Sequence, residues 1–138
     1  MAAAMLRVET TVGLPPEKVW ELWTDPDHIT NWYFASPDWH APRASSDLRV
    51  GGSFVTRMEA RDGSFGFDFG GVYLHVEKPR RLECRLGDGR SLVISFSALD
   101  SGTRIVEDFE AEQMNNPERQ REGWQAILDN FKRYAEAN

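Results

Sequence analysis

One carboxyl group in this sequence occupies a position where chemistry is expected. In the stretch 105–109, strict alternation places Glu107 on the same face as Ile105 and Phe109, which would point into the protein. A buried carboxylate without a partner is costly, so Glu107 should be paired, have a raised pKa or contact a ligand. The alternative is that the strand twists and Glu107 reaches solvent or Arg104.

The three histidines could supply acid–base groups or metal ligands. His28, His40 and His75 are scattered, without the i, i+4 spacing that pairs two zinc ligands on a helix. A metal site would need His40, His75 and a carboxylate to converge in the fold. The sequence contains no G-x-S-x-G, G-x-x-x-x-G-K, G-x-G-x-x-G or H-E-x-x-H motif. We therefore expect no metal and no cofactor.

The single cysteine, Cys84, alternates with Leu82 and Leu86. This pattern predicts a small buried hydrophobic residue and not a nucleophile. One cysteine cannot form an internal disulfide, which fits a reducing compartment. The segment 1–6 lacks the basic start and long apolar stretch of a signal peptide. We therefore expect a soluble, cytoplasmic protein.

The charge balance narrows the classes of partner. Sixteen Lys and Arg residues against 22 Asp and Glu residues leave a formal charge of -6. An acidic chain disfavours nucleic acid and anionic membranes as partners. No apolar run approaches the roughly 18 residues that a membrane span needs. The length of 138 residues fits one domain over 1–138, either as a monomer or as a homodimer.

The aromatic residues are the strongest indication of a binding site. The chain has five Trp, eight Phe and three Tyr. Trp20 and Trp23 lie one helical turn apart and are predicted to be core. The others include a group near the first helices and a group expected to face Trp124, as in an apolar pocket with few polar groups. The candidate ligand-binding residues are Trp32, Phe34, Trp39, His40, Met58, Phe65, Phe67, Glu107 and Trp124.

Two kinds of periodicity predict the elements that position these groups. Residues 6–12 alternate between apolar and polar, which indicates a strand. A helix should begin at Pro16, and Asp25 should cap a second short helix that begins at Pro26. The stretch 37–46, which contains two prolines and two serines, is expected to be a loop.

From residue 47 the period is two, and turn residues separate the runs. The apolar residues of the run 65–76 change phase within it, which requires one extra residue. We expect that bulge at the glycines 70–71. The predicted strands cover 54–59, 65–76, 82–86, 92–98 and 105–109, with hairpin turns at Asp62-Gly63 and Asp88-Gly89.

A long helix should close the chain. Asn116 can cap it, Pro117 fits its first position, and Trp124 lies on its apolar face. Consecutive strands joined by short turns indicate an antiparallel meander with one buried face. The predicted fold class is α+β, with a curved antiparallel sheet wrapped around the long C-terminal helix and two short helices after the first strand.

The order of these motifs resembles the helix-grip, or START-like (SRPBCC), superfamily. Within it the chain looks like the domain family related to the C-terminal part of the activator of the heat-shock-protein-90 ATPase. The resemblance implies a cavity between sheet and helix that commonly holds a hydrophobic small molecule. It rests on Pro16-Glu17-Lys18-Val19-Trp20, Thr24-Asp25-Pro26 with Trp32, Asp47-Leu48-Arg49-Val50-Gly51-Gly52, Gly70-Gly71, Arg81-Leu82, and Gly123-Trp124 with Leu128.

Three functions follow as hypotheses. The first is non-catalytic binding of a small hydrophobic or aromatic molecule in that cavity. The second, implied by relatives in the superfamily, is a polyketide cyclase or aromatase that uses Glu107 or His40 as acid or base. It requires that both groups, or one of them with Tyr73 or Arg49, line a single cavity. The third is a module that modulates a chaperone ATPase, which rests on analogy of fold alone.

Overall fold

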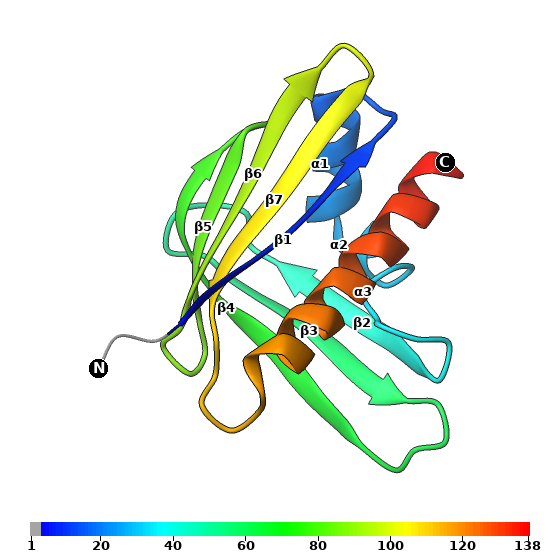
Figure 1. Cartoon of the computed structure of the whole chain (residues 1–138), viewed down its shortest axis with the longest axis vertical. Helices are drawn as coiled ribbons and strands as arrows, with labels where there is room; N and C mark the ends of the chain where they lie inside the picture. Colours follow the sequence, from blue (N-terminus) through cyan, green and yellow to red (C-terminus); the bar gives the residue numbers. More distant parts are fainter. Residues whose placement is uncertain (1–3) are drawn as a thin grey trace.

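Seven strands form one antiparallel sheet in the computed structural model, which describes residues 4–138 (Figure 1). The sheet curves around a long C-terminal helix, and two short helices follow the first strand, so the predicted α+β helix-grip fold is confirmed. The spatial order of the strands is β1-β7-β6-β5-β4-β3-β2. The elements are β1 (Met5–Val12), α1 (Pro16–Thr24), α2 (Pro26–Ile29), β2 (Trp39–Ser46), β3 (Ser53–Ala60), β4 (Gly66–Glu77), β5 (Arg81–Leu86), β6 (Ser91–Leu99), β7 (Gly102–Glu110) and α3 (Pro117–Glu136).

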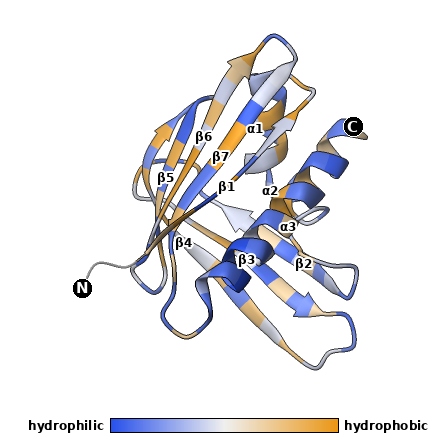
Figure 2. Ribbon diagram, viewed as in Figure 1, coloured by the Kyte–Doolittle hydropathy of each residue, from blue (hydrophilic) through white to orange (hydrophobic). Residues whose placement is uncertain are grey.

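The core lies between the inner face of the sheet and the helices, and its aromatic centre is where α1 and the segment after α2 meet α3. Phe131 of α3 lies edge-on to Trp23 and Trp32, with ring centroids 4.8 and 4.7 Å away. The Trp32 indole N–H donates to the Leu22 carbonyl at 3.1 Å, so this buried ring is also satisfied as a donor. Trp20 and Trp23 are buried as predicted. Figure 2 shows mostly hydrophilic residues on the outward side of α3, as expected for a helix with one buried face.

Side-chain caps fix the starts of α2 and α3. The Asp25 carboxylate accepts from the backbone N–H of Asp27 at 2.9 Å, and Asn116 accepts from the N–H groups of Glu118 and Arg119. Both caps were predicted from the sequence and are confirmed. Because the first backbone N–H groups of a helix have no partner within it, these caps determine where each helix begins.

The predicted loop at 37–46 is wrong over most of its length. Residues Trp39–Ser46 form the edge strand β2, which pairs with β3. Its register shifts between His40 and Arg43, so Pro42 sits in an irregular part of an edge strand. Proline is tolerated there because it lacks the N–H that a regular ladder needs. The prolines and serines of this stretch therefore mark an irregular strand and not a loop.

The change of phase in β4 occurs later than predicted. The register between β4 and β5 shifts between Tyr73 and His75. Tyr73 is buried, whereas Val72 and Leu74 point outward and are 39% and 46% exposed. The predicted bulge at the glycines 70–71 is therefore wrong.

The two glycines of β4 permit close approach of neighbouring backbones. A Cβ on Gly70 would lie 2.2 Å from the Phe54 carbonyl oxygen, and one on Gly71 would lie 2.1 Å from that of Arg85. These contacts are with β3 on one side and β5 on the other. The sheet can therefore pack this tightly at β4 only because both residues lack a side chain.

Within residues 4–138, none of the helices combines the length and the hydropathy that a membrane span needs. Residues 1–3 of the predicted domain 1–138, and of the segment 1–6, lie outside the described residues.

Candidate functional site

A cavity of about 400 Å³ lies between the N-terminal half of α3 and the sheet. Its walls are mainly aromatic and apolar. Its polar residues come from the β5–β6 turn, β7, the segment between β7 and α3, and the first turn of α3. The apolar lining is Trp23, Trp32, Tyr33, Met58, Phe67, Phe69, Trp124 and Ile127, and the polar lining is Arg90, Glu107, Glu112, Asn115, Arg119 and Gln120.

Glu107 is the buried carboxylic acid in the wall of the cavity. It lies on β7 between Ile105 and Phe109, and only 3% of its surface is exposed. Burial raises the pKa of the Glu107 carboxyl to about 8, and no hydrogen bond or ion pair from residues 4–138 offsets this. The predicted inward orientation is confirmed. The alternative contact with Arg104 is wrong, because Arg104 pairs with Glu9 at 2.8 Å on the outer face.

Trp124 forms the α3 side of the cavity. Its indole ring stacks on Phe109, with centroids 3.9 Å apart and ring planes 11° apart. It also meets Phe69 edge-on at 5.7 Å. Trp124 thus points from α3 toward the sheet, as predicted, and holds the helix against β4 and β7.

Tyr33 was missed by sequence reasoning, although both of its neighbours in the chain were named. Its ring stacks on Phe69 with centroids 5.7 Å apart. Burial, and then the charge of Glu107, raise the pKa of Tyr33 well above its usual value. A second, smaller cavity of about 40 Å³ shares Trp23, Tyr33 and Phe69 with the first. The Tyr33–Phe69 pair therefore separates the two spaces.

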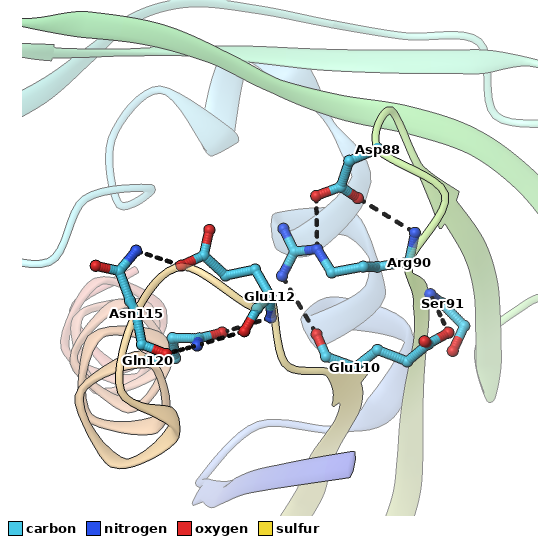
Figure 3. A network of polar contacts seen from close by, with 7 residues as sticks. All are labelled: Asp88, Arg90, Ser91, Glu110, Glu112, Asn115 and Gln120. Atoms are coloured by element: carbon cyan, nitrogen blue, oxygen red, sulfur yellow. Dashed lines mark hydrogen bonds and ion pairs between the residues drawn. The ribbon is translucent and has the colours of Figure 1, made fainter. Parts of the chain in front are cut away.

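A polar network surrounds the mouth of the cavity (Figure 3). Arg90 donates to the Asp88 carboxylate at 2.7 Å and to the Glu110 carbonyl at 3.2 Å. The Gln120 amide accepts from the backbone N–H of Glu112 at 2.8 Å and donates to the Glu112 carbonyl at 3.0 Å. These bonds fix the segment 111–116 against the first turn of α3. Arg119, on α3, also lines the cavity.

Five of the nine candidate ligand-binding residues meet in this cavity: Trp32, Met58, Phe67, Glu107 and Trp124. Phe34, Trp39, His40 and Phe65 do not line it. The structure places Trp39 and Phe65 beside Phe67, with ring centroids 6.0–6.2 Å apart, near the end of the β3–β4 hairpin. Because β2 is an edge strand paired with β3, it carries Trp39 and His40 away from the cavity.

The histidines and the cysteine do not converge. His40 lies 3.7 Å from Glu59, and His75 lies 3.3 Å from Glu77. Among residues 4–138, no group of three or more His, Cys, Asp or Glu side chains is arranged to hold a metal ion. Cys84 is 2% exposed, and burial raises the pKa of its thiol to about 12, so its prediction as a buried hydrophobic residue is confirmed.

Sequence reasoning also missed Trp23 as a lining residue, together with Phe69, Ile127 and the polar mouth. Phe69 shares its odd-numbered phase with Phe67, and Ile127 lies one turn from Trp124, so both carried a usable signal. The mouth residues Arg90 and Glu112 lie outside helices and strands, where no periodicity indicates which way a side chain points. Gln120 lies in α3, four residues before Trp124 and on the same face of the helix, so its position also carried a usable signal.

Comparison with solved structures finds close likeness over the whole chain. A solution structure of an AHSA1-like protein from Aeromonas hydrophila is 46% identical, with a TM-score of 0.92, and the match covers 97% of this chain and 93% of that one. A solution structure from Cytophaga hutchinsonii is 50% identical, with a TM-score of 0.82, and covers 96% and 92%. A crystal structure from Nitrosomonas europaea, 23% identical with a TM-score of 0.80 over 96% and 94%, shows the same fold.

Among proteins with curated descriptions, none matches this sequence. The family model described as activator of Hsp90 ATPase homolog 1-like protein matches residues 13–136. Since that match spans nearly the whole chain, and relatives of 46% and 50% identity share its fold, the chain belongs to the AHSA1-like family.

Proposed function

We propose that this protein binds a small, largely apolar aromatic molecule in the cavity between α3 and the sheet. The observation that carries the proposal is the lining: aromatic and apolar side chains from α1, the segment after α2, β3, β4 and α3 surround a space of about 400 Å³. Pockets for small molecules are typically of roughly 300–1,000 Å³, mainly apolar, with a few polar groups that set orientation.

The arrangement of rings supports an aromatic ligand in particular. Trp124 is already held in place by its stack on Phe109, and Tyr33 is held by its stack on Phe69. Rings that are fixed before binding lose little conformational entropy when a flat ligand packs against them. Offset or edge-on contacts with such rings add about 0.5–1.5 kcal/mol each beyond the apolar area they cover.

The direct test is a titration with naphthalene, followed by the backbone amide signals of the protein in NMR spectra. We expect the largest shifts at residues of α3 and β4 that line the cavity. The variant Ile127→Trp fills the cavity from α3 and should weaken binding at least tenfold. The matched variant Val72→Trp puts the same side chain on the outer face of β4 and should bind as the unmodified protein does. Absence of naphthalene binding, or equal binding by both variants, would contradict the proposal.

The geometry favours binding over the cyclase hypothesis. That hypothesis needs Glu107 and His40, or one of them with Tyr73 or Arg49, in one cavity. Glu107 lines the main cavity, Tyr73 lines the smaller one, and His40 lines neither. Arg49 pairs with Asp47 at 2.9 Å and is largely exposed. An acid and a base that cannot reach the same ligand cannot share one reaction.

A role toward an Hsp90-type chaperone is a second candidate. The observation that favours it is the aromatic group Trp39, Phe65 and Phe67 at the β3–β4 hairpin, where Phe65 is 62% exposed. Exposed aromatic rings are common anchors of protein interfaces. The test is the ATPase rate of a purified Hsp90-type chaperone with and without this protein. Stimulation that Phe65→Ser removes would support the role, and an unchanged rate would contradict it.

A further inference from the structure

Glu107 is a buried residue whose carboxyl group has no hydrogen-bond partner among residues 4–138 and lines the cavity. Of the other buried polar side chains, Thr24 and Thr103 each donate to a backbone carbonyl, at 2.8 and 2.7 Å. No fully enclosed side-chain N or O atom of residues 4–138 lacks a partner, so the Glu107 oxygens are open to the cavity space. Within residues 4–138 no donor or cation reaches the Glu107 carboxyl group, which lies on the cavity wall. Because a buried polar group left unpaired costs about 1–3 kcal/mol, this position is expensive unless something in the cavity contacts it.

The state of this carboxyl group decides what it can contact. With a pKa of about 8, Glu107 is mainly protonated at neutral pH and presents an O–H donor. The titratable groups that face it are Tyr33, from the segment after α2, and Cys84, from β5. Neither carries a positive charge, so neither stabilises the ionised form of Glu107.

The surroundings of the Glu107 carboxyl group select among ligands. The charges at the mouth nearly balance, because Arg90 is bonded to Asp88 and Glu112 lines the cavity together with Arg119. A cationic ligand at the inner end would have to keep Glu107 ionised in an apolar space. An anionic group at the inner end would meet a residue that is itself an acid. A neutral oxygen that accepts a hydrogen bond requires neither an ionised Glu107 nor an anion beside an acid.

We propose that Glu107 is the polar recognition residue of this cavity, and that its ligand is a neutral aromatic compound whose inner end carries a carbonyl oxygen. This inference rests on the proposed function and deepens it. The aromatic body packs against the apolar lining of the cavity, and the Glu107 O–H donates to the oxygen. Binding then gives the Glu107 carboxyl group a hydrogen-bond partner that residues 4–138 do not supply.

The experiment compares three probes of one size: naphthalene, 2-acetylnaphthalene and 2-(aminomethyl)naphthalene. They are titrated at pH 6.5 and pH 9.5 into the protein and into Glu107→Gln, Glu107→Leu and Glu9→Gln. At pH 6.5 we expect the acetyl probe to bind about tenfold or more tightly than naphthalene, and this preference to shrink at pH 9.5, where Glu107 is ionised.

The variants separate the role of the O–H group from that of the space around it. Glu107→Gln keeps a donor, so the preference for the acetyl probe should persist and become independent of pH. Glu107→Leu should bind both neutral probes about equally. Glu9→Gln, which changes a carboxyl group on the outer face of β1 away from the cavity, should behave as the unmodified protein. Amide NMR spectra check that each variant is folded.

Three results would overturn the inference. One is an acetyl preference that survives in Glu107→Leu. Another is tightest binding by the aminomethyl probe at pH 6.5, where its amine is protonated, which would make Glu107 a partner for cations. The third is naphthalene and the acetyl probe binding equally to the unmodified protein, which would leave the proposed function intact. Failure of all three probes to bind would instead contradict the proposed function itself.

Discussion

The ring of Trp124 on α3 lies parallel to the ring of Phe109 on β7, with centroids 3.9 Å apart. Phe109 is two residues from Glu107 on the same strand and points to the same side of the sheet. The stack therefore sets the distance between α3 and the strand that carries the buried acid. A helix held in this way keeps the cavity open beside the stack, because the two rings act as a spacer between helix and sheet.

Replacing Trp124 by alanine should reduce the free energy of unfolding by about 2–4 kcal/mol, because it removes a large apolar side chain and its aromatic contacts. Urea denaturation followed by far-UV circular dichroism measures the change. The control Trp124→Phe keeps a ring opposite Phe109 and should lose less than half as much. A loss below about 1 kcal/mol in the alanine variant would show that the stack does not hold the helix.

The free energy of unfolding should depend on pH through the ionisation of Glu107. Its pKa is raised from 4.5 in the unfolded chain to about 8 in the folded protein, so the folded state holds more protons between these values. Stability contributed by this group is therefore fully present below about pH 4.5 and is lost as the pH rises to about 8. The slope approaches 1.4 kcal/mol per pH unit within that window.

The measurement is the difference in unfolding free energy between Glu107→Gln and the unmodified protein, from urea denaturation at pH 5, 6, 7, 8 and 9. Taking this difference removes the contributions of the other carboxyl groups to the pH dependence, because both proteins contain them. Several of those groups have lowered pKa values and titrate at lower pH. We expect it to grow in favour of the glutamine variant up to about pH 8 and then level off. A difference that stays constant with pH would mean that Glu107 ionises normally.

The fold was predictable because its local signals agree with its global arrangement. The change of period from 3.6 to 2 and back, the caps Asp25 and Asn116, and the Asp-Gly turns all indicate the elements that form. The edge strand β2 was not predictable in the same way, because Pro42 and the serines beside it disfavour strand locally. Pairing with β3, a tertiary effect, outweighs that preference.

The candidate site was predictable only where periodicity determines direction. Alternation placed Glu107 inward, and helical spacing placed Trp124 toward the sheet, and both lie at the cavity. His40 and Trp39 were grouped with them because a loop was expected to reach the cavity mouth. Arg90 owes its place to a hydrogen bond with the Glu110 carbonyl, twenty residues away in sequence, which no local pattern reports.

Cys84 should be unreactive in the folded protein. The thiolate is the reactive form, and burial raises the pKa of the thiol to about 12 while also blocking access. We expect Ellman's reagent to label less than one tenth of the protein within the time that labels it fully in concentrated urea. Rapid labelling without denaturant would mean that the small cavity beside Cys84 opens to solvent.

Two glycines with opposite surroundings should respond in opposite directions to the same substitution. At Gly71 of β4 an added Cβ would lie 2.1 Å from the Arg85 carbonyl oxygen, so Gly71→Ala must push two backbones apart. At Gly123 of α3 nothing lies within 4 Å of the added Cβ.

We expect Gly71→Ala to lose about 2 kcal/mol or more in the free energy of unfolding, because backbone atoms cannot move aside as flexible side chains do. Gly123→Ala should gain about 0.5–1 kcal/mol, because alanine loses less backbone entropy in a helix. Urea midpoints of the two variants measure both changes, and equal shifts would contradict the assignment of Gly71 to a close approach of strands.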